Sequence, residues 1–341
     1  MSGIEPMATG PGSRPTILLT RADVAALMDP AAYLDAVGAG FRAGATGRAQ
    51  APTPLSLPVP GGGFHGKAAS ITLDRDYVAL KFNANFPGNP RGHGLPTIQG
   101  AILLCDGATG VLLAIMDSIE VTLGRTAAAT ALAARYLARR DSRALLICGC
   151  GDQAPAQLAA LRAVLPLERV AVWDVDADRA RAFARVTGRD DFAVVATDDL
   201  TAAARRSDVI VTCTSATTPF LDESMIAPGT FIAAIGADSP GKGEIAPTLM
   251  ARATVVADVI EQCAVMGDLH HALAAGAMTL SQVHGDLGAL VTGQITVPDS
   301  AGITLFDSTG TGIQDVATAV AVFGRACAAG RGTAIALAAV E

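Results

Sequence analysis

The chain has 341 residues, half of them hydrophobic, and a formal net charge of −7 at neutral pH. This length is sufficient for two domains of ordinary size, each with its own core. Because the balance is acidic and no cluster of Lys and Arg stands out, nucleic acid is not an expected partner. The six cysteines contain no CxxC pair, which argues against a secreted disulfide framework and against a zinc site.

The apolar segments are too short to cross a membrane. Runs such as AILLC, VLLAIM and ALLIC end well before the ~20 residues that a spanning helix needs. Residues 1–15 have no apolar core, contain Glu5 and are rich in Gly and Pro, so they do not resemble a signal peptide. We expect a flexible N-terminal tail on a cytoplasmic protein that does not bind membranes.

Residues 16–115 have the pattern of an α+β region. A helical segment at 22–44 is followed by Pro- and Gly-rich sequence at 50–63. Short apolar runs at 77–83, 100–106 and 111–117 are typical of strands.

From residue 126 to 306, apolar strands alternate with Ala-rich helical segments. The strands are expected at 144–149, 169–174, 208–214, 230–236 and 253–258. Near-continuous apolar strands of this kind indicate a parallel sheet with both faces covered. From Thr304 the chain has the pattern of a strand, a glycine turn and a final helix.

A glycine-rich turn follows the first of these strands. Gly149-Cys150-Gly151-Asp152-Gln153-Ala154 has the form GxGxxA and precedes a helix. The first glycine allows a tight turn, the second lets backbone approach a pyrophosphate, and the small third residue lets helix and strand pack closely. The start of the helix offers N–H groups to the phosphates. The alternative to a dinucleotide site is that the same turn occurs in an α/β domain that binds no cofactor.

Asp174 ends the second strand of the same region. An acid at this position accepts a hydrogen bond from the 2′-hydroxyl of NAD and repels the 2′-phosphate of NADP, so NAD is the expected cofactor. Cys148 and Cys150 could form a metal dyad, but their place at a strand end and in the turn favours buried thiols. Adjacent His270 and His271 point in different directions on a helix, and we expect no metal.

Three polar residues interrupt their local pattern. Arg125 lies in the apolar stripe of a helix that either Asp117 or Ser118 caps. A buried guanidinium needs an anion, which could be a substrate carboxylate, a pyrophosphate or a core aspartate in a structural ion pair. Lys81 lies in a strand, where a solvated lysine is the ordinary interpretation. Asp238 follows the strand at 230–236, where it could exchange protons or merely start a turn.

These residues fall in segments that resemble a known family. The segments 80–100, 116–139, 235–245 and 304–315 resemble, in order and spacing, the ornithine cyclodeaminase/mu-crystallin family. The resemblance extends over nearly all of residues 16–330, and the glycine motif lies between the second and third segments.

The resemblance implies an α/β fold in which a Rossmann NAD-binding domain, residues 126–306, is inserted into a smaller α+β domain. That smaller domain would consist of residues 16–125 and 307–341, bind substrate and form a homodimer. Members of the family act on L-amino acids or on cyclic and linear imines with NAD(P)(H). Cyclodeaminases of the family oxidise ornithine or lysine transiently, cyclise it and release ammonia.

The resemblance also implies roles for individual residues. Lys81 matches a catalytic lysine that contacts the substrate carboxylate, and Arg125 matches an arginine near that carboxylate and the cofactor. Asp238 matches the residue that donates and accepts the proton, and Thr309 falls beside the substrate. The positions that match cofactor contacts, besides Gly149 and Gly151, are Thr97, Asp152, Gln153, Asp174, Thr214, Lys242 and Ser308.

The sequence departs from the family pattern in two places. Pro54 stands where many members have an arginine that also binds the carboxylate. The next strand reads GGFHGKAAS and lacks the glutamate that holds the distal amine of ornithine. We hypothesise that His65 or Lys67 replaces the missing cation; the alternative is that both are exposed loop residues.

A cation at that position disfavours ornithine and suits a small 2-imino acid, including one with a second acidic group. The sequence therefore predicts an imine reductase or amino-acid dehydrogenase, with a cyclodeaminase as the alternative. A non-enzymatic mu-crystallin-like ligand-binding protein is a further alternative. That role would not require Asp238, so its presence with Lys81 and Arg125 favours an enzyme.

Overall fold

The computed structural model describes residues 15–188, 192–297 and 302–337. The chain divides into two compact units: the first runs to Arg125 and resumes at Thr311, and the second is Thr126–Gly310. The expected N-terminal tail, residues 1–15, lies outside the described residues except for Pro15. No helix in the described ranges combines the length and the apolar character needed to span a membrane.

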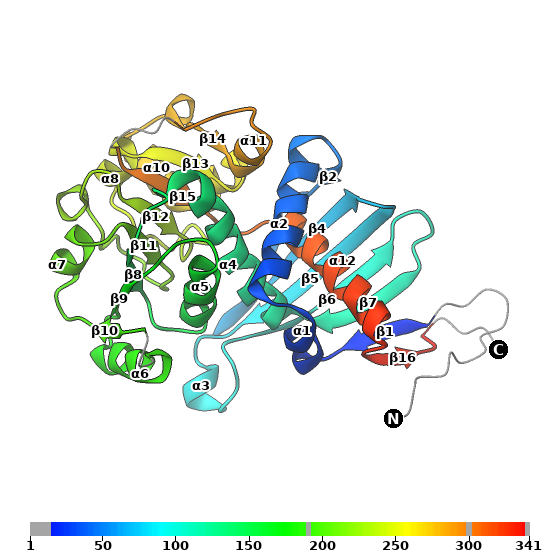
Figure 1. Ribbon diagram of the computed structural model, residues 1–341. Coiled ribbons are helices and arrows are strands. Elements are labelled where there is room, and N and C mark those ends of the chain that lie inside the picture. The colour runs from blue at the N-terminus through cyan, green and yellow to red at the C-terminus, as the bar shows by residue number, and fades with distance from the viewer. Residues whose placement is uncertain (1–14, 189–191, 298–301, 338–341) are drawn as a thin grey trace. The chain divides into compact units, whose positions relative to one another are not determined.

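The first unit is built on a mixed β-sheet whose strand order is β16-β1-β7-β6-β5-β4-β2, with β3 paired to β4 (Figure 1). Its pairs are antiparallel except for β1 with β7. The strands are β1 (Thr16–Leu19), β2 (Ala49–Gln50), β3 (Leu55–Val59), β4 (Gly62–Thr72), β5 (Asp76–Asn85), β6 (Ile98–Asp106), β7 (Leu112–Asp117) and β16 (Thr333–Ile335).

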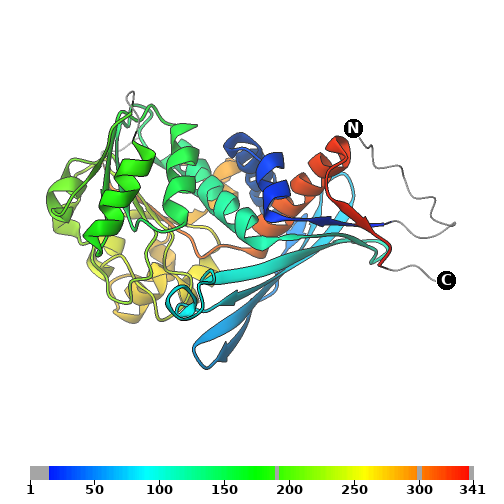
Figure 2. The same ribbon diagram turned by 90° about the horizontal axis from the view of Figure 1, so that it is seen from below.

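The helical segment expected at 22–44 is two helices, α1 (Arg21–Leu27) and α2 (Pro30–Ala45). They separate because Asp29 caps α2 through a hydrogen bond from the Ala32 amide, and Pro30 occupies the first helical position. The unit also contains the short α3 (Asn89–Gly92), the beginning of α4 (Ser118–Leu137) and the C-terminal α12 (Gly312–Ala329). Helices α2 and α12 pack together against the sheet, on the same face (Figure 2).

Strand β5 turns its polar side toward these helices. Lys81 is aligned with Ile102 of β6, which is aligned with Met116 of β7 and then with Leu19 of β1, and all four residues are buried. Lys81 is only 4% exposed, so the interpretation of a solvated strand lysine is wrong. The apolar side chains that alternate with it, Val78, Leu80 and Phe82, are 40–45% exposed on the opposite face.

The second unit contains a parallel sheet with the order β10-β9-β8-β11-β12-β15-β13-β14, which confirms the parallel sheet predicted from the apolar strands. Its first five strands follow the doubly wound order of dinucleotide-binding domains. The strands are β8 (Ala144–Cys148), β9 (Arg169–Trp173), β10 (Val194–Ala196), β11 (Val209–Thr212), β12 (Phe231–Ala234), β13 (Thr254–Ala257), β14 (Gly285–Asp286) and β15 (Thr304–Asp307).

Short helices connect these strands around a core of buried aliphatic side chains such as Leu146, Ile210, Ile232 and Leu305. The helices are α5 (Gln153–Arg162), α6 (Ala177–Thr187), α7 (Leu200–Arg205), α8 (Pro247–Arg252), α9 (Ile260–Met266), α10 (Asp268–Ala274) and α11 (Leu287–Val291), with 3₁₀ turns at Glu223–Met225 and Leu280–Gln282. Because the strands are parallel, the loops that follow β8, β9, β11, β12 and β15 begin at one edge of the sheet. Ligands of open α/β sheets bind at this edge.

Helix α4 packs against α2 at Gly124. A Cβ atom at this position would overlap the ring of Tyr33, whose hydroxyl donates a hydrogen bond of 3.2 Å to the Glu120 carbonyl. The Tyr33 ring therefore fills the space that the absence of a side chain at Gly124 leaves.

We predict that Gly124→Ala lowers the free energy of unfolding by about 1–3 kcal/mol, the usual cost of overpacking. Alanine normally stabilises a helix interior relative to glycine, so the close ring reverses the sign. Gly324→Ala is the matched control, because Gly324 is exposed on α12 with no atom within 4 Å of the added Cβ. Urea denaturation of both variants provides the measurement. Equal stabilisation by the two substitutions would contradict the packing of Tyr33 on Gly124.

Candidate functional site

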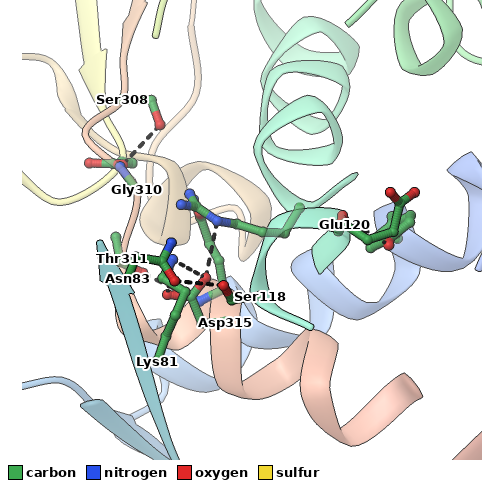
Figure 3. Close-up of polar contacts among 12 residues, drawn as sticks. Lys81, Asn83, Ser118, Glu120, Ser308, Gly310, Thr311 and Asp315 are labelled. Atoms are coloured by element: carbon green, nitrogen blue, oxygen red, sulfur yellow. Dashed lines mark hydrogen bonds and ion pairs between the residues drawn. The ribbon is translucent and has the colours of Figure 1, made fainter. Parts of the chain in front are cut away.

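In the first unit Lys81 and Arg125 share one carboxylate, that of Asp315. The Lys81 Nζ atom lies 2.8 and 2.7 Å from the two carboxylate oxygens, and Arg125 Nε lies 3.1 Å from Oδ1 (Figure 3). The three side chains are 5%, 6% and 1% exposed. The sequence allowed three anions as partners of Arg125: a substrate carboxylate, a pyrophosphate or a core aspartate. In the structure the partner is a core aspartate, Asp315.

The guanidinium of Arg125 has further capacity for an anion. Its Nη1 donates a 2.6 Å hydrogen bond to Gln314 Oε1, next to Asp315 on α12. Nε is buried and, although it is 3.1 Å from Asp315 Oδ1, makes no hydrogen bond to the described residues. Because a guanidinium has five N–H donors in a planar fork, the ion pair with Asp315 does not exhaust it.

Positive charge dominates this cluster. Burial lowers the pKa of Lys81 to about 7, with Asp315 opposing the shift and Arg125 and Lys67 adding to it. Burial alone would raise the pKa of Asp315, but Lys81 and Arg125 outweigh it and the pKa falls below the ordinary value. Asp315 is therefore ionised and surrounded by cations.

Asn83 lies two residues beyond Lys81 on the same face of β5. Its Oδ1 accepts a 2.6 Å hydrogen bond from the Ser118 hydroxyl, which orients the amide (Figure 3). Ser118 is thus not the helix cap. Asp117 caps α4 instead, because its carboxylate accepts hydrogen bonds from the amides of Ile119 and Glu120 at 3.0 and 2.8 Å.

His65 and Lys67 are in strand β4 and not in a loop. Lys67 is aligned with Lys81 across the β4–β5 pair, and His65 is aligned with Asn83. Residues that face each other in an antiparallel pair project from the same side of the sheet. Both side chains are half-buried, so the alternative of exposed loop residues is wrong.

In the second unit, the turn after β8 has the geometry that a pyrophosphate needs. Gly149 has φ +99°, and a Cβ there would meet the Cys213 carbonyl, whereas the space at Gly151 is open. Ala154 is fully buried against the sheet. Helix α5 begins at Gln153, and the Asp152 side chain does not cap it, so backbone N–H groups at its start can donate to phosphate oxygens. The residues fit a dinucleotide.

Asp174 is held beside this turn. Its Oδ2 accepts a 2.8 Å hydrogen bond from the Cys150 amide, and Oδ1 accepts one of 2.9 Å from the Asp176 amide. Each oxygen has a second lone pair for a ribose hydroxyl. Burial raises the pKa of Cys150 to about 12, so it is a thiol. Among the described residues no group of His, Cys, Asp and Glu is arranged to hold a metal ion.

Asp238 and Lys242 form an ion pair in the loop after β12. Their carboxylate and ammonium are 2.7 Å apart, and the Asp238 side chain is half exposed. His271 of α10 holds the same loop through a 2.6 Å contact between Nε2 and the Lys242 carbonyl. The sequence predicted a cofactor contact for Lys242 but did not indicate its pairing with Asp238.

Glu244, at the end of this loop, is a fully buried carboxylate that the sequence analysis missed. It accepts hydrogen bonds from the hydroxyls of Thr212 and Thr214, both at 2.6 Å, and from the amides of Thr214 and Gly236 at 2.7 and 2.9 Å. Burial raises its pKa to about 7, with the Asp268 carboxylate adding to the shift. Glu244 thus ties the loop that bears Asp238 to Thr214.

Ser308 and Thr309 follow β15 and belong to the second unit. Asp258 accepts hydrogen bonds from the Ser308 hydroxyl at 2.9 Å and from the Gly310 amide at 2.7 Å. The Thr309 hydroxyl accepts from Gln262 Nε2 at 2.6 Å. Thr97 lies in the first unit, before β6, where its carbonyl accepts from the Phe86 amide at 2.8 Å.

Residues 14–330 match the model of the ornithine cyclodeaminase/mu-crystallin family. An archaeal alanine dehydrogenase dimer with bound NAD is 35% identical, with a TM-score of 0.90 over 94% of this chain and 99% of that one.

Two further solved structures are similar. The Δ1-pyrroline-2-carboxylate reductase of Thermococcus litoralis, in complex with NADH and L-proline, is 28% identical, with a TM-score of 0.89 over 93% of this chain and 99% of that one. The iminosuccinate reductase of Paracoccus denitrificans, in complex with NAD⁺, is 31% identical, with a TM-score of 0.87 over 94% and 99%.

The raised pKa of Glu244 predicts a pH-dependent stability. Because its pKa is about 7 in the folded chain and 4.5 ordinarily, protonation favours folding; the contribution is complete below pH 4.5 and is lost as the pH rises to 7. Relative to Glu244→Gln, the free energy of unfolding of the wild type should fall by about 2–3 kcal/mol over this range.

Denaturant titrations at pH 4.5, 6 and 7.5 provide the measurement. Glu223→Gln is the control, because Glu223 is exposed in the same unit; its pH dependence should equal that of the wild type. Parallel curves for the wild type and Glu244→Gln would show that Glu244 does not take up a proton on folding.

Proposed function

Because the chain belongs to the ornithine cyclodeaminase/mu-crystallin family, we propose that it is an NAD(H)-dependent oxidoreductase that interconverts a small 2-imino acid or ketimine and the L-amino acid. The observation that carries the proposal is the buried pair of cations, Lys81 and Arg125, around a single carboxylate. Buried charge of this kind is costly unless it has an anion to bind. The first unit would bind substrate and the second, Thr126–Gly310, the cofactor.

In the proposed reaction Lys81 and Arg125 bind the substrate carboxylate and so fix the position of Cα. Asn83 adds an oriented amide donor on the same face of β5. Asp238 gives a proton to the imine nitrogen in the reductive direction and takes one from the amine in the oxidative direction. NAD(H), when bound, accepts or supplies the hydride.

NAD is the cofactor that the second unit fits. The three similar structures contain NAD, NADH and NAD⁺. The Asp174 carboxylate, fixed by the amides of Cys150 and Asp176, would accept from a ribose 2′-hydroxyl and would repel a 2′-phosphate. The predicted cytoplasmic location stays a prediction.

Lys67 favours the reductase over the cyclodeaminase. It is aligned with Lys81 on the inward face of the sheet, and its charge lowers the pKa of Lys81. An ammonium here repels the distal amine of ornithine and attracts a second carboxylate. The proposed substrates are therefore imines of small 2-oxo acids, with dicarboxylic ones favoured.

The test is an assay in which the purified protein reduces a panel of imines with NADH. The loss of NADH is followed by its absorbance at 340 nm. The panel contains pyruvate, glyoxylate and oxaloacetate, each with ammonia, and the cyclic pyrroline and piperideine carboxylates. We expect stoichiometric loss of NADH with one or more of them, and a loss of kcat/KM of about 100-fold or more in Asp238→Asn.

A parallel reaction contains ornithine and NAD⁺ and is assayed for proline and ammonia. Release of both without net NADH would identify a cyclodeaminase and contradict the proposal. The same panel with Lys67→Met tests the substrate class: KM should rise more for oxaloacetate imine than for pyruvate imine. An equal KM for wild type and variant would refute the role of Lys67.

We further propose that a second copy of the chain covers the outward face of the first unit's sheet. Leu18, Ile115, Leu103 and Leu80 are aligned across four adjacent strands on this face. Three of them are 37–41% exposed, and Val78 and Phe82 extend the apolar surface along β5. Contiguous apolar surface of this kind marks interaction sites. The 35% identical alanine dehydrogenase is a dimer.

Leu80→Lys should convert the dimer to a monomer, because a charged side chain would be buried in the apolar interface. Light scattering after size-exclusion chromatography measures the mass. Val186→Lys is the control, since Val186 is an exposed valine on α6 in the second unit. A dimeric Leu80→Lys variant, or a monomeric wild type, would contradict this arrangement.

A further inference from the structure

Asp315 lies in the first turn of α12, which is fixed by a helix cap and by close packing on β4. Thr311 caps α12 by accepting a hydrogen bond from the Gln314 amide. Gly312 follows in the first turn, and a Cβ there would overlap the Ala68 carbonyl of β4. The first turn of α12 therefore lies directly on the strand pair that carries Lys67 and Lys81.

The contacts of Asp315 are directed at two side chains. Both of its oxygens lie within 2.8 Å of Lys81 Nζ, and Oδ1 is also 3.1 Å from Arg125 Nε. The adjacent Gln314 holds Arg125 Nη1 at 2.6 Å. One helical turn thus fixes a lysine of β5 and an arginine of α4, two cations that would otherwise repel each other.

We propose that Asp315 is a positioning residue: it holds the Lys81 ammonium and the Arg125 guanidinium in the orientation that binds a substrate carboxylate, and it keeps the ammonium protonated. This inference rests on the proposed function. Asp315 itself does not contact substrate and stays ionised throughout the reaction.

The titratable, charged and apolar groups on the elements around Lys81 support this role. Lys67 and His65 lie on β4, Arg125 lies on α4, and β6 presents the apolar Ile102. Asp315, on α12, is the anion in this set. Burial lowers the pKa of Lys81 to about 7 even with Asp315 present. Without it, Lys81 would lose its proton at lower pH and could no longer bind a carboxylate.

The experiment compares Asp315→Asn and Asp315→Glu with the wild type in the imine reduction, as a function of pH. For Asp315→Asn we expect a KM increase of about 30-fold or more, the size of effect that follows when one partner of a buried ion pair is removed. The dissociation constant of NADH should change less than about twofold, since the cofactor binds through other residues. Asp35→Asn, on the exposed side of α2 in the same unit, is the matched control.

The pH profile separates positioning from a merely structural role. Because kcat/KM reports the ionisation of the free enzyme, its fall on the alkaline side should follow Lys81. The midpoint should move to lower pH in Asp315→Asn and stay near the wild-type value in Asp315→Glu, whose KM should rise less. A folded Asp315→Asn with wild-type KM and midpoint would overturn the proposal. If that variant does not fold, Asp315→Glu with an unchanged KM would overturn it.

If the wild type reduces none of the imines, the proposed function fails and a different readout tests Asp315. The probe is then acetate, and its binding is followed by the NMR signal of ¹³C-labelled Lys81, assigned with Lys81→Arg. Acetate should shift the signal in the wild type and in Asp35→Asn, but not in Asp315→Asn. No response in the wild type, or an equal response in Asp315→Asn, would overturn the role of Asp315.

Discussion

The buried ion cluster of Lys81, Arg125 and Asp315 is the interaction on which the first unit depends. It joins β5, α4 and α12, so it fixes the C-terminal helix onto a sheet formed by the N-terminal part of the chain. Such a cluster is a poor source of stability, because desolvation of the charges offsets their attraction. The free-energy cost of burying the excess positive charge would be offset by the binding of an anion. In the proposed function, the same contacts that close the unit also hold the two cations that would bind the substrate carboxylate.

Much of the second unit could be predicted from the sequence, because its signals are local. Near-continuous apolar strands such as 144–148 and 209–212 are typical of a parallel sheet, and GxGxxA needs its glycines for the turn itself. Asp174 could be singled out because it ends the strand that follows that turn, and the structure places its carboxylate against the Cys150 amide of the turn. Glu244 was missed: its partners Thr212, Thr214 and Gly236 become neighbours only when the strand ends meet.

The first unit was harder to predict, since one of its strands, β5, reverses the usual rule of burial. In β5 the polar side, with Lys81 and Asn83, faces the helices, and the apolar Val78 and Leu80 face outward. Alternation shows that a strand has two sides but not which one is covered. Asp315 lies 234 residues from Lys81, and only its position in the apolar stripe of the last helix could have marked it.

The two units differ in the sign of the charges that they bury. The first buries two cations around one carboxylate, whereas the second buries carboxylates without cations beside them among the described residues: Glu244, Asp258 and Asp307 each accept a hydrogen bond from a backbone amide. The pKa of Lys81 and that of Glu244 are both shifted to about 7, by burial in each case. A rise in pH through 7 thus removes a positive charge from one unit and adds a negative charge to the other. The physical cause is the same in both units: burial disfavours the charged form, an ammonium in the first unit and a carboxylate in the second.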